Sequence, residues 1–363
     1  MRRGVDREPV AVNGKERLLA ACRYQAVDRV PVWMMRQAGR ALPGYRALRQ
    51  RHSFLELCKT PELAAEVSAE PVEALGADAS IVFSDILMVA EAMGLRLEVT
   101  DAGPVLDGFR PDQDGISRLR EFDPERETKF VGDAIRQITR RLGPEIPVIG
   151  FAGAPWTLAC YMLARGEDSS TAHRAREMLY AEPSLLDALL KKIARVTGNY
   201  LAAQIRAGAA VVQLFDTWAG ELDRASYEAF ALPATRLAID TLEPAGTPVI
   251  LYARGCAHIL ESMAKTGATV LSVDWRVDLS QARQRLGPNL ALQGNVDPYA
   301  LLGPTDAVER AAREAVAQTG GAGHILNLGH GLLPMTPLEN AKAFVRAGQS
   351  LRIGHIAGAE RGA

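Results

Sequence analysis

Short apolar runs alternate with longer amphipathic segments along the whole chain. Eight runs of four to six residues are apolar almost throughout: 30–35, 79–84, 146–151, 210–215, 248–252, 269–273, 290–293 and 324–328. They are too short for helices and too continuously apolar for half-exposed strands. We therefore predict that they form buried parallel strands.

Helical patterns occupy the intervals between these runs, for example residues 61–75, 184–206, 258–266 and 305–318. Three predicted helices end in Gly-Ala directly before a strand, at Gly76, Gly208 and Gly267. Glycine adopts the left-handed C-cap conformation without steric cost, so this dipeptide is typical of a short loop from helix to strand.

Eight strands separated by helices predict an α/β fold, a single (β/α)8 barrel of the TIM type. An open doubly wound sheet is the alternative, but no GxGxxG follows the first strand. The second and third strands begin 67 residues apart, and segment 95–124 is rich in Gly, Pro and Asp. We expect an extended βα loop or a hairpin after strand 2.

Domain organisation follows from what the chain lacks. It has no internal repeat, low-complexity tract or interdomain linker. One domain over residues 1–363 is therefore the better interpretation, with a core from about residue 16 to 350 and flexible tails.

Composition excludes several classes of protein. With 48% hydrophobic and 23% charged residues, the chain is neither disordered nor fibrous. It has no apolar stretch long enough for membrane insertion and no signal peptide at its N-terminus. Its four cysteines are far apart, which favours the reducing cytoplasm.

Charge is distributed unevenly. Residues 1–51 hold 12 Lys or Arg against 4 Asp or Glu, although the net charge of the chain is −1. A basic segment in an otherwise acidic protein indicates an anionic partner. Nucleic acid is disfavoured, because the segment has no helix-turn-helix, zinc-finger or interleaved aromatic pattern.

Polar side chains follow most of the predicted strands. In a barrel, the carboxyl ends of the strands meet at one rim, where reactive residues lie. The residues concerned include Arg36, Arg40, Asp85, Tyr161, Thr217 and His330, together with the segment Asp274-Trp275-Arg276. We therefore expect a site at this rim.

The two arginines after the first strand belong to a loop. Arg36 and Arg40 flank Gly39, and two guanidinium groups on one loop can each bind a carboxylate or a phosphate through two hydrogen bonds. A pair of solvated surface arginines is an equal alternative from spacing alone. No GxxxxGK[ST] loop supports phosphate.

The other candidates each have a structural alternative. Asp85 needs a cation or N–H donors if it is buried, but it is equally well placed to cap the next helix. Tyr161 fits a core position, and Thr217 fits a helix N-cap. His330 lies between two glycines that leave its ring accessible, and an ordinary histidine titrates near neutrality. A lone histidine is nevertheless more often structural than catalytic.

Metal and nucleophile chemistry have weaker support. Cys256 and His258 supply two ligands where zinc needs three or four, so a helix start is the preferred interpretation of this segment. The chain has no GxSxG motif and no lysine at a strand end for a Schiff base.

Seven strings of the sequence resemble motifs of the uroporphyrinogen decarboxylase family, in the family's order. They are PVWMMRQAGRALPGYR, the FSD at 83–85, GFAGAPWTLACYM, QLFDTWAG, the VDW at 273–275, QGNVDP and NLGHG. The resemblance runs from about residue 28 to 340, and its first string is highly specific.

This resemblance implies a barrel, a homodimer and decarboxylation without cofactor or metal. The substrate would be uroporphyrinogen III, whose four acetate side chains become methyl groups to give coproporphyrinogen III in haem biosynthesis. The implied site comprises Arg36, Gln37, Ala38, Gly39, Arg40, Asp85, Tyr161, Phe215, Thr217 and His330, with Arg49 as a weaker addition. The Tyr252–Cys256 stretch departs from the family pattern.

The implied chemistry agrees with the residue types. Loss of CO2 requires an electron sink, and a protonated, cationic pyrrole can be its own. Asp85 would accept hydrogen bonds from pyrrole N–H groups and stabilise the cation. Arg36 and Arg40 would bind substrate carboxylates, assisted by Tyr161, Thr217 and His330. The proton donor stays unassigned.

Two other functions remain open at this stage. One is a zinc-dependent methyltransferase of a related barrel family, for which Cys256 and His258 would supply ligands, although NLGH at the eighth strand brings no further cysteine. The other is a tetrapyrrole-binding protein without catalytic activity, for which the arginine loop would suffice.

Overall fold

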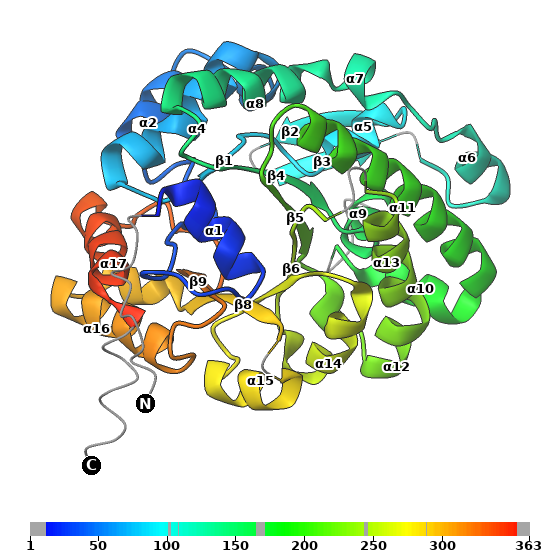
Figure 1. Ribbon diagram of the computed structural model, residues 1–363. Coiled ribbons are helices and arrows are strands. Elements are labelled where there is room, and N and C mark those ends of the chain that lie inside the picture. Colours follow the sequence, from blue (N-terminus) through cyan, green and yellow to red (C-terminus); the bar gives the residue numbers. More distant parts are fainter. Residues whose placement is uncertain are drawn as a thin grey trace.

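Seven parallel strands form one curled sheet in the computed structural model, which describes residues 12–100, 103–107, 109–164, 171–242, 246–287 and 289–353. Viewed along its axis, the sheet is surrounded by helices (Figure 1). The strands, in the order in which they pair, are β1 (Ser80–Ile81), β4 (Val148–Gly153), β5 (Val211–Asp216), β6 (Val249–Ala253), β7 (Val270–Val273), β8 (Ala291–Val296) and β9 (His324–Leu328).

The first predicted strand, residues 30–35, is an irregular segment that connects the two edges of this sheet. Its Val32 forms a parallel bridge with Leu326 of β9, and the N–H of Leu326 donates to the Pro31 oxygen at 2.9 Å. On the other side, the N–H of Asp78 donates to the Val32 oxygen at 2.8 Å, next to β1. Proline has no N–H for a continuous ladder, which explains the irregularity.

A carboxylate reinforces this closing segment. Asp78 accepts the N–H of Val32 at 2.9 Å and two hydrogen bonds from Arg29 at 2.6 and 2.7 Å. Together, the sheet and the segment make the α/β barrel that the strand pattern predicts.

The main outer helices alternate with the strands along the chain, and the last of them follows β9. They are α4 (Pro61–Leu75), α8 (Lys129–Leu142), α11 (Pro183–Arg206), α13 (Leu232–Asp240), α15 (Leu279–Leu286), α16 (Thr305–Ala317) and α17 (Leu338–Ser350). The glycines expected to end three helices all have positive φ: Gly76 75°, Gly208 119° and Gly267 92°. The predicted loop chemistry is confirmed at these positions.

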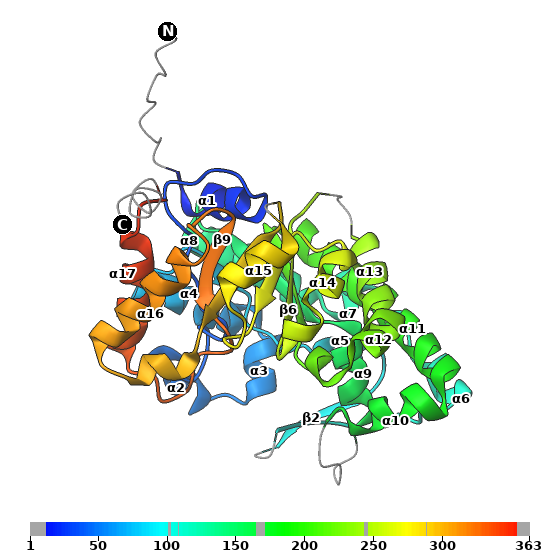
Figure 2. The same cartoon turned by 90° about the horizontal axis from the view of Figure 1, so that it is seen from below.

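Helix α1 (Gly14–Cys22) covers the amino-terminal end of the barrel (Figures 1 and 2). It starts with a capping box, in which the Asn13 side chain accepts from the N–H of Glu16 and the Glu16 carboxylate accepts from the N–H of Asn13. Its buried Leu18, Ala21 and Cys22 pack against one inward apolar residue from nearly every strand, such as Ile250. This end is therefore filled and carries no open site.

Between that apolar layer and the carboxyl-terminal rim, the barrel interior is polar and largely hydrogen-bonded, although Gln213 Nε2 has no described partner. The amide of Gln293 accepts from Trp33 Nε1 at 3.0 Å and donates to Gln213 and Ser272 at 3.1 and 2.9 Å. All four side chains are fully buried. The network fixes the middle of the barrel below the carboxyl-terminal rim.

The chain makes a long excursion between β1 and β4. After α5 (Met88–Ala92), strands β2 (Arg96–Thr100) and β3 (Gly103–Asp107) form an antiparallel pair, followed by α6 (Gln113–Arg118) and α7 (Pro124–Glu127). The pair leaves Val99 and Val105 exposed. Figure 2 places β2 at the end of the molecule opposite α1.

The smaller helices lie mostly at that opposite end. They are α2 (Pro43–Arg49), α3 (Phe54–Lys59), α9 (Pro155–Leu163), α10 (His173–Ala181), α12 (Arg224–Ser226) and α14 (Leu260–Met263), with five further short 3-10 or π turns, η1–η5.

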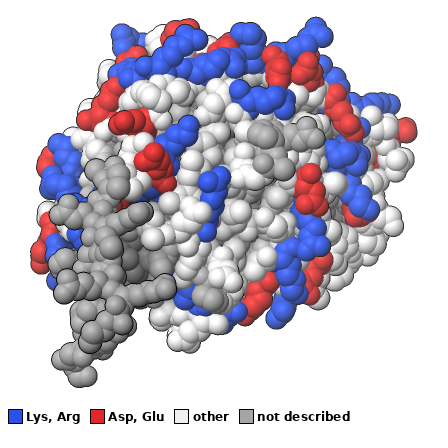
Figure 3. Space-filling view, viewed as in Figure 1, with Lys and Arg blue, Asp and Glu red and all other residues white. Residues whose placement is uncertain are grey.

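The basic charge of residues 1–51 is partly neutralised within the fold. Arg17 pairs with Asp28 at 2.7 Å, and Arg29 pairs with Asp78. Arg2, Arg3, Arg7 and the rest of residues 1–11, like residues 354–363, lie outside the described part of the chain. On the face that carries α1, acidic and basic side chains gather mainly around the edge (Figure 3). No described helix is long and apolar enough to cross a bilayer.

Candidate active site

Arg36 begins the rim loop in a left-handed backbone conformation. Its φ is 59°, one of two positive values among the described non-glycine residues. This conformation costs an arginine about 1 kcal/mol or more and is found preferentially at functional sites. The exposed Arg36 side chain lies against Gly331, where an added Cβ would be 2.3 Å from the Arg36 Cδ atom.

The loop after Arg36 is anchored by a glutamine. Gln37 is fully buried, its Oε1 accepts from the Met34 N–H at 3.0 Å, and its Nε2 donates to the Ala79 oxygen at 2.8 Å. Its side chain therefore ties the loop to β1, and only its backbone remains for a ligand. Ala38 and Gly39 are half-buried.

Arg40 and Arg49 lie further along the same loop and helix. Arg40 is exposed, and its backbone oxygen accepts from Arg46 at 3.2 Å. Arg49, at the end of α2, donates to the backbone oxygen of His52. Within the described part of the chain, neither Arg36 nor Arg40 has a carboxylate partner, so both guanidinium groups are available to an anion.

Asp85 lies after β1 in surroundings of low polarity. Burial raises the pKa of its carboxyl group, although the N–H of Leu87, at 2.8 Å from Oδ1, and the charge of Arg36 oppose the shift. Leu87, the N-cap of α5, has no side-chain cap of its own, and its N–H is held by Asp85, so the carboxylate also supports the turn that leads into this helix. An added cation or further N–H donors would therefore stabilise the ionised form of Asp85.

Aromatic rings form an arc along the inner side of the rim. Centroid distances run from Phe151–Phe215 at 5.6 Å through Phe215–Tyr252 at 5.9 Å and Tyr252–His330 at 6.1 Å to Trp275–His330 at 6.4 Å. The rings come from β4, β5 and β6 and from the segments that follow β7 and β9. Tyr252 is fully buried behind the others, so a flat ligand would contact the half-buried members of the arc, such as Phe215 and Trp275.

Tyr161 and Thr217 lie nearby on α9 and after β5. The Tyr161 ring packs edge-on against Trp218 at 6.4 Å, and burial raises the pKa of its phenol. Thr217 is half-buried and is not the N-cap of η1 (Ala219–Glu221), because Trp218 has that position. The helix-capping alternative for Thr217 is therefore excluded.

The two glycines around His330 have separate steric causes. A Cβ on Gly331 would collide with the Arg36 side chain, and a Cβ on Gly329 would lie 2.3 Å from the backbone nitrogen of Trp275. The Gly-His-Gly sequence thus lets three strand ends approach one another closely.

His330 is neutral at physiological pH. Burial, followed by the charges of Arg36, Arg254 and Arg276, lowers its pKa to about 4. Its Nδ1 accepts the N–H of Gly331 at 2.6 Å, which leaves the proton of the neutral ring on Nε2. The expectation of titration near neutrality is wrong, and His330 is a hydrogen-bond donor rather than an acid.

The rim also holds groups that the sequence-based site did not include. Arg276 pairs with the fully buried Asp274 at 2.5 Å and lies over the Trp275 ring at 4.2 Å, while Arg254 is exposed beyond the end of β6. Their position after predicted strands was the available signal, but sequence could not show that they face His330.

Asp216 at the end of β5 is a further buried carboxyl group. Its Oδ1 accepts from the Thr157 hydroxyl at 2.8 Å, and its Oδ2 has no described partner. Burial raises its pKa to about 7. Asp216 is fully buried beneath Thr217 and Trp218, so it is a structural group rather than a rim group.

Cys256 and His258 are not arranged as a metal pair. Cys256 is fully buried and burial raises its thiol pKa to about 12, while His258 Nε2 lies 2.6 Å from the Leu222 oxygen. Across the described ranges, no three His, Cys, Asp or Glu side chains are grouped closely enough to hold an ion. The preferred interpretation of this segment as a helix start agrees with η3 (Cys256–His258).

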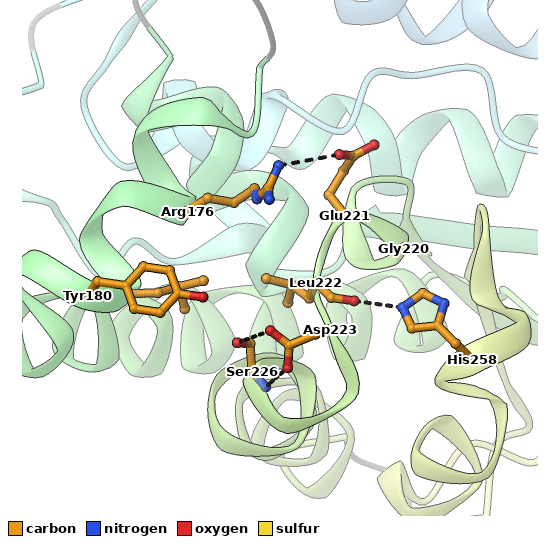
Figure 4. A pocket seen from close by; sticks show the side chains of 9 residues that line it. Arg176, Tyr180, Gly220, Glu221, Leu222, Asp223, Ser226 and His258 are labelled. Carbon is orange, nitrogen blue, oxygen red and sulfur yellow. Dashed lines mark hydrogen bonds and ion pairs between the residues drawn. The ribbon is translucent and has the colours of Figure 1, made fainter.

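A separate pocket of about 410 Å³ lies outside the rim (Figure 4). Arg176 points toward Glu221 at 3.7 Å, and Asp223 accepts hydrogen bonds from Ser226. None of the predicted site residues lines this pocket. Its polar groups are largely satisfied by one another, so the rim is the better candidate.

Comparison with known sequences gives a consistent result. The family model described as uroporphyrinogen decarboxylase matches residues 13–351. The protein from Geobacter metallireducens, named uroporphyrinogen decarboxylase, is 48% identical over 90% of this chain and 95% of its own length. The protein of the same name from Trichlorobacter lovleyi is 47% identical over 91% and 96%.

Solved structures give a broader picture. A methyltransferase from Methanosarcina mazei superposes with a TM-score of 0.81 and 26% identity, covering 93% of this chain and 98% of its own. A putative vitamin-B12 independent methionine synthase from Listeria monocytogenes has a TM-score of 0.56 at 13% identity, covering 89% and 96%. The second likeness concerns the fold alone.

Proposed function

The chain belongs to the uroporphyrinogen decarboxylase family, and from this premise we propose that it converts uroporphyrinogen III into coproporphyrinogen III in haem biosynthesis. As a carboxy-lyase it would remove CO2 from four acetate side chains. The observation that carries the proposal is the 48% identity to a decarboxylase over 95% of that protein's length. The residues of the rim suggest how the substrate would be bound and how the charge of the reaction would be stabilised.

The proposed reaction uses the pyrrole ring as its own electron sink. A proton adds to the ring carbon beside the one that bears the acetate, and the positive charge spreads to the ring nitrogen. The electrons of the breaking C–C bond enter the ring as CO2 leaves. The exocyclic methylene then takes a proton, and the ring carbon releases one. Each cycle thus consumes one proton and replaces a carboxylate by hydrogen.

Asp85 would stabilise the cation in this scheme. Its carboxylate is held by the Leu87 N–H in surroundings where burial already disfavours its charge. Pyrrole N–H groups would compensate that cost on binding, and a cationic ring would compensate it further in the transition state. The interaction therefore strengthens as the reaction proceeds.

The other rim residues would hold the substrate. Arg36 and Arg40 would bind acetate or propionate carboxylates, and the backbone of Gln37, Ala38 and Gly39 would line the same loop. Hydroxyl groups of Tyr161 and Thr217 and the Nε2–H of His330 would donate to further carboxylates. Phe215 would contact the macrocycle as part of the aromatic arc.

The proton would come from water or from a substrate carboxylate bound to arginine. His330 is not the acid near neutral pH, because its imidazolium form has a pKa of about 4 and the Nε2 proton of the neutral ring is far too weakly acidic. Arginine is too weak an acid to serve directly. No cofactor is needed in this scheme, since the ring supplies the electron sink.

The test is an anaerobic incubation of purified, EDTA-treated protein with uroporphyrinogen III. Products are oxidised and separated by their number of carboxylates. A ladder from eight carboxylates to four is the expected result. Absence of the ladder with the macrocycle still bound would favour the non-catalytic binding protein, and absence of both would overturn the tetrapyrrole assignment.

The zinc-dependent methyltransferase is the second candidate, because of the structural likeness to the Methanosarcina mazei protein. Its prediction is stoichiometric, tightly bound zinc in the purified protein and methyl transfer to a thiol. Metal analysis of the same preparation distinguishes it from a decarboxylase that remains active after EDTA treatment.

We also propose that the enzyme is a cytoplasmic homodimer, as the family resemblance implies. Sedimentation equilibrium measures its mass directly. A mass of about twice the 39.2 kDa chain is expected, and a monomer at micromolar concentration would contradict the proposal.

A further inference from the structure

A second pair of arginines lies on the rim, away from the Arg36 loop. Arg254 follows β6 two residues after Tyr252, and Arg276 follows β7 directly after Trp275. Tyr252 and Trp275 both belong to the aromatic arc around His330. We refer to Arg254 and Arg276 as the β6–β7 arginine pair.

Arg276 is held in place before any ligand binds. Asp274, fully buried, pairs with it at 2.5 Å and also accepts the Gly255 N–H at 2.8 Å. The guanidinium plane rests over Trp275 at 4.2 Å, and the Arg276 side chain is still 49% exposed. A cation fixed in this way loses little conformational entropy when it binds an anion.

Arg254 is free of such an anchor. Within the ranges that the structure describes, it has no ion-pair partner. It comes directly after Ala253, the last residue of β6, and the Tyr252 hydroxyl on the same strand donates to the Gly329 oxygen at 3.1 Å. Arg254 therefore lies at the rim, at the end of the strand that contacts the segment carrying His330.

Electrostatic coupling agrees with this placement. The charges of Arg254 and Arg276, like that of Arg36, lower the pKa of His330. The charges of both arginine groups therefore reach the His330 ring.

The two groups occupy different arcs of the barrel. In the sheet order, β6 and β7 are three and four strands from β1, which carries Asp85, while the Arg36 segment lies next to β1 on the other side. A macrocycle with its N–H groups on Asp85 would extend across the rim. Its eight carboxylates point outward all around, so one loop cannot reach them all.

We propose that the β6–β7 arginine pair binds substrate carboxylates on the side of the macrocycle away from the Arg36 loop. This inference rests on the proposed decarboxylase function. The pair contacts rings that are not reacting, so it contributes equally to substrate and transition-state binding. Its loss therefore raises KM and leaves kcat unchanged.

The experiment compares Arg254→Gln, Arg276→Gln and Arg276→Lys with the wild-type enzyme. Each Gln variant is expected to raise KM about tenfold with kcat within about twofold, which follows from loss of one charge-assisted hydrogen bond. Intermediates with seven, six and five carboxylates should accumulate. Arg276→Lys should recover part of the affinity. Arg313→Gln, an exposed arginine paired with Glu309 on α16, is the matched control for charge.

Two readouts do not depend on turnover. Fluorescence titration with coproporphyrin III should show weaker binding in both Gln variants, and NMR titration of the His330 ring should show a raised pKa. Arg276→Gln removes the ion-pair partner of the buried Asp274, so its folding is checked by thermal unfolding. Arg254→Gln breaks no ion pair of the described structure, so a change in its binding can be attributed to the ligand contact.

The possible outcomes separate the inference from the function on which it rests. A wild-type ladder together with unchanged KM and porphyrin affinity in Arg254→Gln and Arg276→Lys would overturn the inference and leave the function intact. If the wild-type enzyme produced no such ladder, the proposed function would be refuted. The coproporphyrin III titration would then still test whether the β6–β7 arginine pair binds carboxylates.

Discussion

Asp85 combines an unfavourable environment with a role that needs its charge. Replacement by Asn keeps the shape and removes the charge. We expect turnover to fall about 10²–10³-fold, as for loss of one preorganised electrostatic contact, with the melting temperature unchanged or raised because the buried charge is gone.

Product analysis by carboxylate number and thermal unfolding measure the two effects. Asp187→Asn, on the exposed surface of α11 in a pair with Lys191, is the control. Near-normal turnover of Asp85→Asn would refute the electrostatic role.

His324 gives a prediction for stability. It is fully buried, with Nε2 2.9 Å from the Gly294 oxygen and Nδ1 2.9 Å from the Thr319 hydroxyl, and burial lowers its pKa from 6.5 to about 4. Between those pH values the unfolded chain binds a proton that the folded chain does not. The contribution of His324 to the free energy of unfolding should therefore fall by about 3 kcal/mol as the pH drops from 6.5 to 4.

Urea unfolding at a series of pH values measures this slope. His324→Gln should be less stable at pH 7 and show a flatter dependence, while His173→Gln, at the exposed start of α10, should follow the wild type. Equal slopes in all three proteins would rule out His324 as the cause.

The sequence predicted where residues lie on the barrel better than it predicted the contacts that their side chains make. Arg36 and Asp85 lie at strand ends as expected, because the carboxyl ends of parallel strands share a rim. The anchoring of Gln37 and the low pKa of His330 could not be predicted from sequence. The first depends on the distant Ala79, and the second depends on burial of the ring in the folded rim and then on the nearby arginine charges.

At the scale of elements, the approach of three strand ends around His330 depends on two glycines. In Gly331→Ala the new methyl group meets the flexible Arg36 side chain, so the fold should survive while kcat/KM falls about tenfold or more. In Gly329→Ala it meets the Trp275 backbone, which cannot move freely, so stability should fall by about 1–3 kcal/mol.

Kinetics and urea unfolding of the two variants test this contrast. If Gly331→Ala lost as much stability as Gly329→Ala while keeping normal kinetics, the assignment of the two contacts would be wrong.

Strand positions were predictable because buried parallel strands are continuously apolar. The first run, 30–35, is an exception. It is as apolar as a strand, but Pro31 has no N–H to donate, and the N–H of Val32 donates to the Asp78 carboxylate instead of a neighbouring strand. The antiparallel pair β2–β3 was expected only as a loop or hairpin. Val99 and Val105 in this pair are exposed, so the pair lacks the alternation of buried apolar and exposed polar residues by which a strand is recognised in a sequence.

At the scale of the whole molecule, a chain with a net charge of −1 concentrates unpaired arginines at one rim. Binding of a substrate with eight carboxylates should therefore weaken with salt. Between 0.1 and 1 M NaCl the Debye length falls from about 10 to about 3 Å, and we expect KM to rise severalfold with little change in kcat.

Initial rates at several salt concentrations measure this effect, with sucrose at matched viscosity as the control. A KM that is independent of salt would show that rim charges do not hold the substrate.

Closure of the barrel joins residues from the two ends of the chain. Val32 forms a bridge with Leu326, and Arg36 comes four residues after Val32. During synthesis, β9 leaves the ribosome long after the Arg36 loop, so the loop acquires its position only when nearly the whole polypeptide has emerged. Prematurely terminated chains that lack β9 therefore cannot assemble the anion-binding loop, however much of the remaining barrel they contain.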